Sequence, residues 1–492
     1  MGKDAGSHTL TAIVPVLSEP QVLEEHLEEV GKDIQVNPFI PFHRLETTHF
    51  LSWVLVPGPR DEQGREGAPR LVCEASFDEP REDFLKRLHR EAGSTLKEQV
   101  YSHCAPSPWT DAGGFEAFFL AHSRKAALLY AGYPEVSVGM IDEDDGAHWR
   151  FHQRIVMGLA SGATGITGPQ GGSEDERIDQ VVDLCHGFVT EAEAPGAAAA
   201  RSQLPLDPGR EPPSWRTRFM RSLPARIARS ALVVPAGVVG GLLLGYEVLS
   251  SAVAEVRSRL RGGASPLTTA DAGEAARKRR AQALARIEDR EDHKGQNHLT
   301  HYVELKPGLL RLPVLRVVLW GWGQLAKIWF TEGSLGGIEG IHFARWLIID
   351  GGRRRWPSPT KEGRRRWPEV SLKRRCMLFL SNYDGSWERY LSSFIDRGGI
   401  GLTTIWCNTQ GFPRTRLRWS PSSGWWPFKL ELGSDRAEEF KQWVRDHQLP
   451  SLIWYSRHPD LSVVNIRRNR EIHAGVGLDA DPMKRRRWLQ LL

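Results

Sequence analysis

The chain has 492 residues, of which 40% are hydrophobic and 25% charged, and its net charge is +5. The length exceeds that of one ordinary domain, so two or three domains are expected, and the composition excludes a fibrous or disordered chain. Five scattered cysteines form no CxxC pair, which argues against a zinc ribbon or a disulfide scaffold and fits a reducing compartment. No apolar run opens the sequence, so we expect a cytoplasmic protein.

The first 160 residues predict an alternation of strands and helices. Residues 10–17 (LTAIVPVL) read as a strand, which Pro15 places at a sheet edge. The elements expected after it are a helix over 22–34, strands over 49–56 and 71–77, a helix from about 80 to 89 with Asp78 as its N-cap, and further segments over 96–101, 115–121 and 126–130. The order strand–helix–strand–strand–helix–strand is typical of a ferredoxin-like unit.

A second stretch, residues 298–475, repeats this pattern. The matched positions, all in the same order, are Leu299 with Leu10, His342 with His49, Trp346 with Trp53, Asp384 with Asp78, and Tyr455 with Tyr130. We infer an internal duplication, the alternative being two generic α+β segments that share common residues. The predicted fold class is α+β, with two tandem ferredoxin-like repeats (1–160 and 298–475). A linker region (161–297) with an apolar helical segment (230–254) joins them, and a basic tail (476–492) follows.

Two segments suggest contact with a membrane. Residues 230–246 carry no charge over seventeen residues, which is short of the roughly 20 that a spanning helix needs, so a hairpin or a surface helix is expected. Residues 309–330 combine basic residues with Trp320 and Trp322, and the loop after the next strand carries Arg364, Arg365 and Arg366. These residues are candidates for an anionic membrane surface. The alternatives are a buried helix with snorkelling cations and a solvated loop. No nucleic-acid-binding motif accompanies the arginines, so nucleic acid is not an expected partner.

The candidate catalytic residues are His342, Arg345 and Asp384. His342 and Arg345 are three residues apart in a strand, so they face opposite sides unless the strand bulges. Asp384 ends a strand and either caps the next helix or serves as an acid. The candidate ligand-binding residues are Asn382, Gly385, Trp387 and Asn408. No HExxH, GxSxG, P-loop or GxGxxG pattern is present, so whether the chain is an enzyme stays open and no metal ligands are assigned.

The tandem units and the string Ser381-Asn382-Tyr383-Asp384-Gly385 resemble the dimeric α+β-barrel superfamily, and distantly its dye-decolourising peroxidases. Those enzymes carry a Gly-x-x-Asp-Gly motif, and Ser381 stands here in place of the first Gly. The resemblance implies haem as cofactor, Asp384 as acid–base residue and Arg345 as distal cation, with no proximal ligand assigned. The strings NHLTHYVELKPG, IHFARW, SNYDGSWE and GFP also resemble a family of bacterial proteins, for which no activity is implied.

Two functions are therefore expected. One is a membrane-associated redox-type protein, haem-peroxidase-like or binding a hydrophobic small molecule, with its pocket in the second repeat. The other is a non-enzymatic module for a membrane surface or a protein partner. The two repeats are expected to pack on each other or within an oligomer. Residues that both repeats share are expected to serve the fold. A functional site is therefore expected among the residues that differ between the repeats.

Overall fold

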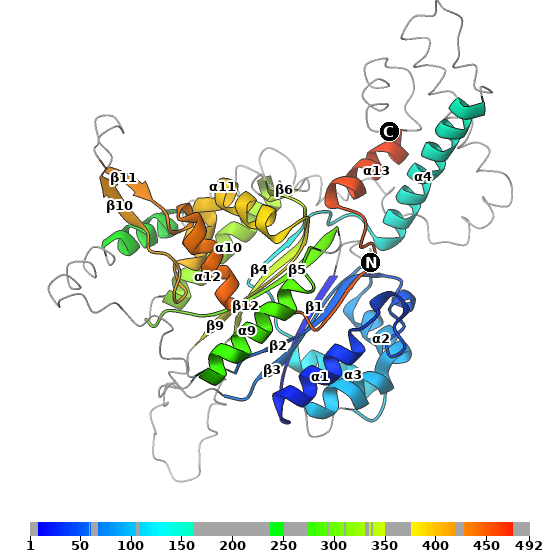
Figure 1. Ribbon diagram of the computed structural model, residues 1–492, viewed down its shortest axis with the longest axis horizontal. Helices are drawn as coiled ribbons and strands as arrows, with labels where there is room; N and C mark the ends of the chain where they lie inside the picture. The colour runs from blue at the N-terminus through cyan, green and yellow to red at the C-terminus, as the bar shows by residue number, and fades with distance from the viewer. Residues whose placement is uncertain are drawn as a thin grey trace, which may run out of the picture.

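A computed structural model describes residues 8–58, 60, 67–104, 109–161, 237–249, 274–292, 295–308, 311–329, 334–335, 338–349, 375–419 and 428–475. Two antiparallel sheets form its centre (Figure 1). The first sheet has the order β1 (His8–Pro15), β3 (Arg70–Phe77), β2 (Thr48–Val56) and β13 (Ile453–Ser456). The second has the order β12 (Gln448–Leu449), β5 (Gln296–Glu304), β9 (Cys376–Asp384), β8 (Ile341–Ile349) and β4 (Leu128–Ala131). The predicted α+β class is confirmed, and β1 lies at a sheet edge as Pro15 indicated.

The last strand of each half lies in the sheet of the other half. β4 follows the first-half strands in sequence but pairs with β8, and β13 follows the second-half strands but pairs with β2. The place beside β5 is taken instead by the short strand β12. A self-contained ferredoxin-like unit would keep its four strands in one sheet. The strand pairing here therefore differs from the two separate repeats that the sequence predicts.

The two halves repeat the same strand registers. Cross-strand partners in the first half and their counterparts in the second are Thr9↔Ser76 and His298↔Asn382, Ser52↔Glu74 and Arg345↔Leu380, and Ile453↔Trp53 and Leu128↔Trp346. Even the bulge recurs, between Thr48 and Phe50 in β2 and between Ile341 and Phe343 in β8. These registers match residues of β1, β2, β3 and β4 with residues of β5, β8, β9 and β13, respectively.

Four layers result from the alternation of side chains along each strand. In β3, Leu71 and Cys73 face a core under helices α1 to α3, whereas Val72 faces a second core between the two sheets. The second sheet repeats this, because Met377 in β9 faces helices α10 to α12 while Leu378 faces the other sheet. Figure 1 shows α1 to α3 and α10 to α12 on opposite outer sides of the paired sheets.

The helices that cover the first sheet are α1 (Pro20–Val30), α2 (Arg81–Thr95) and α3 (Ala112–His122), and those over the second are α10 (Arg311–Trp329), α11 (Trp387–Trp406) and α12 (Ala437–His447). Helices α4 (Val138–Ser161) and α13 (Val463–Gly475) pack together beyond the sheets, and α9 (Glu274–Glu288) lies beside α1. The short helices are η1 (Ile34–Val36), η2 (Phe42–Arg44), η3 (Leu96–Val100), η4 (Tyr101–His103) and η6 (Gly433–Asp435), and two small hairpins pair β6 (Ser334–Leu335) with β7 (Ile338–Glu339) and β10 (Arg416–Trp419) with β11 (Phe428–Glu431).

Candidate functional site

His342, which is buried, and Asp384, which is partly buried, form a pair at one end of the sheets. The His342 Nε2 lies 2.7 Å from Asp384 Oδ1, and Asp384 Oδ2 accepts a hydrogen bond of 2.7 Å from the backbone N–H of Val463, the first residue of α13. A carboxylate at a helix N-terminus is stabilised by the unpaired N–H groups there. Asp384 therefore anchors α13, and the expectation that it caps the following helix is wrong: Ser386 is the N-cap of α11.

The first half repeats this arrangement. His49 Nε2 lies 2.7 Å from Asp78 Oδ1, and Asp78 Oδ2 accepts from the backbone N–H of Val138 at the start of α4. Asp78 is likewise not the N-cap of α2, a place held by Pro80. Because both halves carry the pair with the same partners, its evident role is to fix the two outer helices.

Arg345 lies in the space between the sheets and has no exposed surface. Its Nε is 3.0 Å from Glu74 Oε1 in the opposite sheet. The guanidinium also donates to the backbone oxygens of Leu10 and Ala75 at 3.1 and 3.2 Å and to Ser76 Oγ at 2.5 Å. Although β8 bulges at His342, Arg345 and His342 share no bonding partner among the described residues, so the strand does not bring these two predicted residues into one site.

Glu74 is one of the residues that the sequence did not reveal. Its Oε2 lies 3.0 Å from His298 Nε2, so the carboxylate connects Arg345 to His298. Burial alone would raise the pKa of the Glu74 carboxyl, but Arg345 and then the hydrogen bond of His298 outweigh it, and the pKa lies below its ordinary value. The available signal was a charged residue inside the apolar strand 71–77 (LVCEASF), where an unpaired carboxylate would be costly.

The four predicted ligand-binding residues all bond to the protein itself. Gly385 has φ +73°, which favours glycine, and its carbonyl accepts from Asn297 at 2.8 Å. Asn408 donates to the carbonyls of Thr404 and Ile405 and so caps the end of α11, while the Arg445 guanidinium lies 3.8 Å over the Trp387 ring. Asn382 Oδ1 accepts from Trp454 at 2.9 Å, and its Nδ2 is buried with no hydrogen-bond partner in the described part of the chain.

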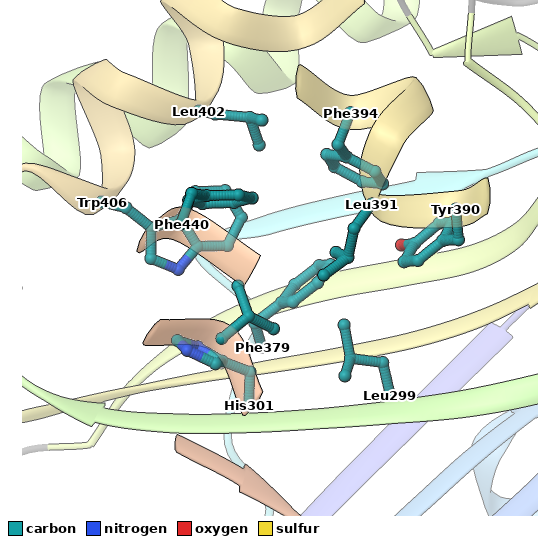
Figure 2. Close-up of a pocket in the computed structure, with 10 residues that line it drawn as sticks. Leu299, His301, Phe379, Tyr390, Leu391, Phe394, Leu402, Trp406 and Phe440 are labelled. Carbon is teal, nitrogen blue, oxygen red and sulfur yellow. The ribbon is translucent and has the colours of Figure 1, made fainter. Parts of the chain in front are cut away.

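The haem that the resemblance implies does not fit the residues described beside Asp384 and Arg345, since both side chains are held by protein groups. A cavity elsewhere in the second half is also too small for haem. It lies over the outer face of the second sheet, where α11 and α12 enclose a volume of ≈ 10 Å³, and Figure 2 shows its lining. His301 faces it with both ring nitrogens lacking a hydrogen-bond partner among the described residues, and burial lowers the pKa of this imidazole well below its ordinary value. Sites for small organic ligands occupy about 300–1,000 Å³, so this cavity is too small for a tetrapyrrole.

The predicted membrane residues divide three ways. Arg364, Arg365 and Arg366 lie outside the described residues. On α10, Trp320 is 44% exposed, whereas Trp322 is half-buried and donates to Thr404 Oγ1 at 3.2 Å. None of the helices that the structure describes is both long enough and apolar enough to cross a bilayer.

Residues 237–249, from the predicted apolar segment, form a helix whose charged residue is buried and whose large apolar side chains are exposed, the reverse of an ordinary surface helix. Its single charged residue, Glu247, is buried and pairs with Lys306 at 3.2 Å and with Arg311. Leu243 joins the core of the second half. The opposite face carries the large exposed side chains, spaced four, four and three residues apart: Val238, Leu242, Tyr246 and Leu249. We call these four residues the apolar stripe.

In comparisons with known proteins, no protein-family model, curated protein or solved structure matches the chain.

Proposed function

We propose that the chain is a module that binds the surface of anionic membranes through the helix of residues 237–249, and that its halves are two copies of one ferredoxin-like unit that exchange their last strands. The observation that carries the membrane proposal is the apolar stripe. A helix on the surface of a globular protein normally directs its charged residues to the solvent. In this helix Glu247 is buried, and the side chains of the apolar stripe are exposed.

The charges around this helix suit a headgroup layer. In the sequence, Arg221, Arg226 and Arg229 precede it, and Arg257, Arg259 and Arg261 follow it. A helix that lies in the interface buries an apolar face while basic residues meet anionic lipid. Arg311, at the start of α10, lies over the Tyr246 ring at 5.0 Å, so the stripe adjoins the helix that carries the exposed Trp320. Indole rings favour the headgroup level.

The stripe offers enough area for measurable binding. Leu242 is 70% exposed, and since full burial of a leucine side chain contributes about 1.5–3 kcal/mol, covering what remains exposed contributes about 1–2 kcal/mol. Replacing Leu242 by Gln should therefore lower the membrane partition coefficient by roughly 5- to 30-fold. The double change with Tyr246→Gln should lower it further.

The test is flotation of the full chain with phosphatidylcholine vesicles, with and without phosphatidylserine. We expect binding to the mixed vesicles that weakens as salt is added, because salt screens charges at a membrane surface. The matched control is Val36→Gln, since Val36 is a large apolar residue, 83% exposed, on η1 of the first half. Equal flotation of the Leu242→Gln and Val36→Gln variants, or no flotation of the unaltered chain, would overturn the proposal.

A further inference from the structure

A groove of ≈ 370 Å³ lies where the two halves meet α9. Its walls come from α1, α9, β5 and the chain between β12 and β13, and Arg286 of α9, which lines it, bonds to Glu24 of α1 at 3.0 Å. Its volume is that of a site for a small organic molecule. The groove does not involve the apolar stripe, and the inference drawn from it is independent of the membrane proposal.

A chain of three side chains leads from this groove into the space between the sheets. Ser451 and His298 line the groove, with Ser451 Oγ 2.5 Å from His298 Nδ1. On its other side the imidazole meets the buried carboxylate of Glu74, with His298 Nε2 3.0 Å from Glu74 Oε2. A hydroxyl that contacts an imidazole, itself oriented by a carboxylate, is the arrangement that activates a serine nucleophile. We propose that Ser451, His298 and Glu74 are a catalytic triad for hydrolysis of small carboxylic esters.

Arg345 stabilises the negative charge on Glu74 that the triad needs. Its guanidinium pairs with Glu74 and keeps the carboxylate ionised in spite of full burial. An ionised Glu74 accepts a hydrogen bond from the N–H at His298 Nε2, so Nδ1 carries no proton and is the acceptor that faces Ser451. Arg345 is accordingly a positioning residue, since it touches neither the groove nor the reacting atoms.

The reaction then proceeds with groups in reach of one another. Ser451 Oγ forms a bond to the ester carbonyl carbon while His298 Nδ1 takes the hydroxyl proton, and the same nitrogen returns a proton to the departing alcohol. Water, deprotonated by His298, attacks the acyl-serine, releases the carboxylic acid and restores the Ser451 hydroxyl. Arg290 supplies positive charge nearby, since its Nη1 donates to the backbone oxygens of Ser451 and Leu452 at 2.7 and 3.0 Å.

The pseudo-symmetry of the two halves distinguishes the triad and Arg345 from residues that only stabilise the fold. The strand registers place Thr9 at the position of His298, Ser52 at that of Arg345 and Leu380 at that of Glu74. Ala126, two residues before β4, corresponds to Ser451, two residues before β13. The symmetry-related position of each of the four residues thus carries a different residue, whereas both halves keep the His–Asp pairs that anchor α4 and α13. Groups that only held the strands together would be expected in both halves.

The test uses the full chain, a fluorophosphonate probe and p-nitrophenyl butyrate. We expect the probe to attach to Ser451, located by peptide mass spectrometry, and the ester to be hydrolysed. Ser451→Ala should abolish labelling and lower the rate at least roughly 100-fold, and His298→Asn should do the same, because a positioned base contributes a factor of this size. The control is Ser393→Ala, which removes a half-buried hydroxyl of α11 that lies outside the groove and donates to the backbone oxygen of Arg389.

Each outcome decides the matter. A wild-type chain that is not labelled at Ser451 and hydrolyses the ester no faster than Ser451→Ala overturns the triad, and Ser451 then only ties the chain between β12 and β13 to His298. Labelling that persists in folded His298→Asn protein, checked by circular dichroism, overturns the assignment of His298 as base.

Discussion

Replacement of Arg345 by Met should expose how much the space between the sheets depends on one ion pair. Arg345 has no exposed surface and Glu74 only 2%, so the change leaves a carboxylate buried without its cation. Breaking a buried pair by removing one partner costs about 3–5 kcal/mol. We expect a loss of this size in the free energy of unfolding, measured by urea denaturation at pH 7 with the slope against urea unchanged.

A second substitution tests the cause. Leu380 occupies in the other half the position of Glu74, so a leucine is compatible with this place in the fold. Glu74→Leu combined with Arg345→Met should recover about 2–3 kcal/mol relative to the sum of the single losses, since residues in contact couple by amounts of this order. A single loss below about 1 kcal/mol, or losses that simply add, would refute the reasoning.

The pH dependence gives an independent check. In the native chain the pKa of Glu74 is lowered, so its ionisation contributes stability above the unfolded value of about 4.3, which is lost as the pH falls through the folded value. In Arg345→Met the largest opposing contribution is lost, and we expect burial to outweigh the remaining hydrogen bonds of His298 and Ser52 and so to raise the folded pKa of Glu74 above the unfolded one. The carboxylate then costs stability at neutral pH, and the cost disappears on acidification. The deficit of the variant relative to wild type should therefore shrink between pH 7 and about pH 4.5.

Two further predictions concern the His–Asp pairs and the cysteines. Asp78→Asn and Asp384→Asn should each cost about 1–3 kcal/mol by urea denaturation, because a charge-assisted bond to an outer helix is weakened in both; a clearly larger loss for one would show that the two sites are not equivalent. Burial raises the pKa of Cys73, Cys104 and Cys407 to about 12 and of Cys376 to about 11. In a Cys185→Ser background, these four thiols should resist a thiol reagent near pH 8 until urea unfolds the chain, and rapid reaction of the native protein would contradict their described burial.

Local patterns in the sequence predict the strands well, because alternating or continuous apolar runs such as 49–56 and 71–77 can form little else. The exchange of β4 and β13 is invisible at that level. Nothing in the four residues of β4 distinguishes pairing with β2 from pairing with β8, which lies about 200 residues further along the chain and is selected only by tertiary packing.

The residues of the candidate site were also predictable only in part. The sequence analysis named Arg345 as a candidate catalytic residue, and the structure shows Arg345 at the centre of the buried network. His298, Glu74 and Ser451 escaped notice because they lie in three separate segments. Alternation tells which face of a strand a side chain occupies, but it does not tell which residue of an opposite sheet stands across from it.

The strand exchange also sets the order in which the protein can be completed during synthesis. The first sheet has its outer strand β2 at residues 48–56, yet the strand that covers this edge is made only at residues 453–456. At about 5–20 residues per second, the roughly 400 residues between them take about 20–80 s to translate. Throughout that interval the nascent chain presents an open strand edge, which is a template for aggregation. Ribosome-associated chaperones should thus matter more for this chain than for two independently folding domains of the same size.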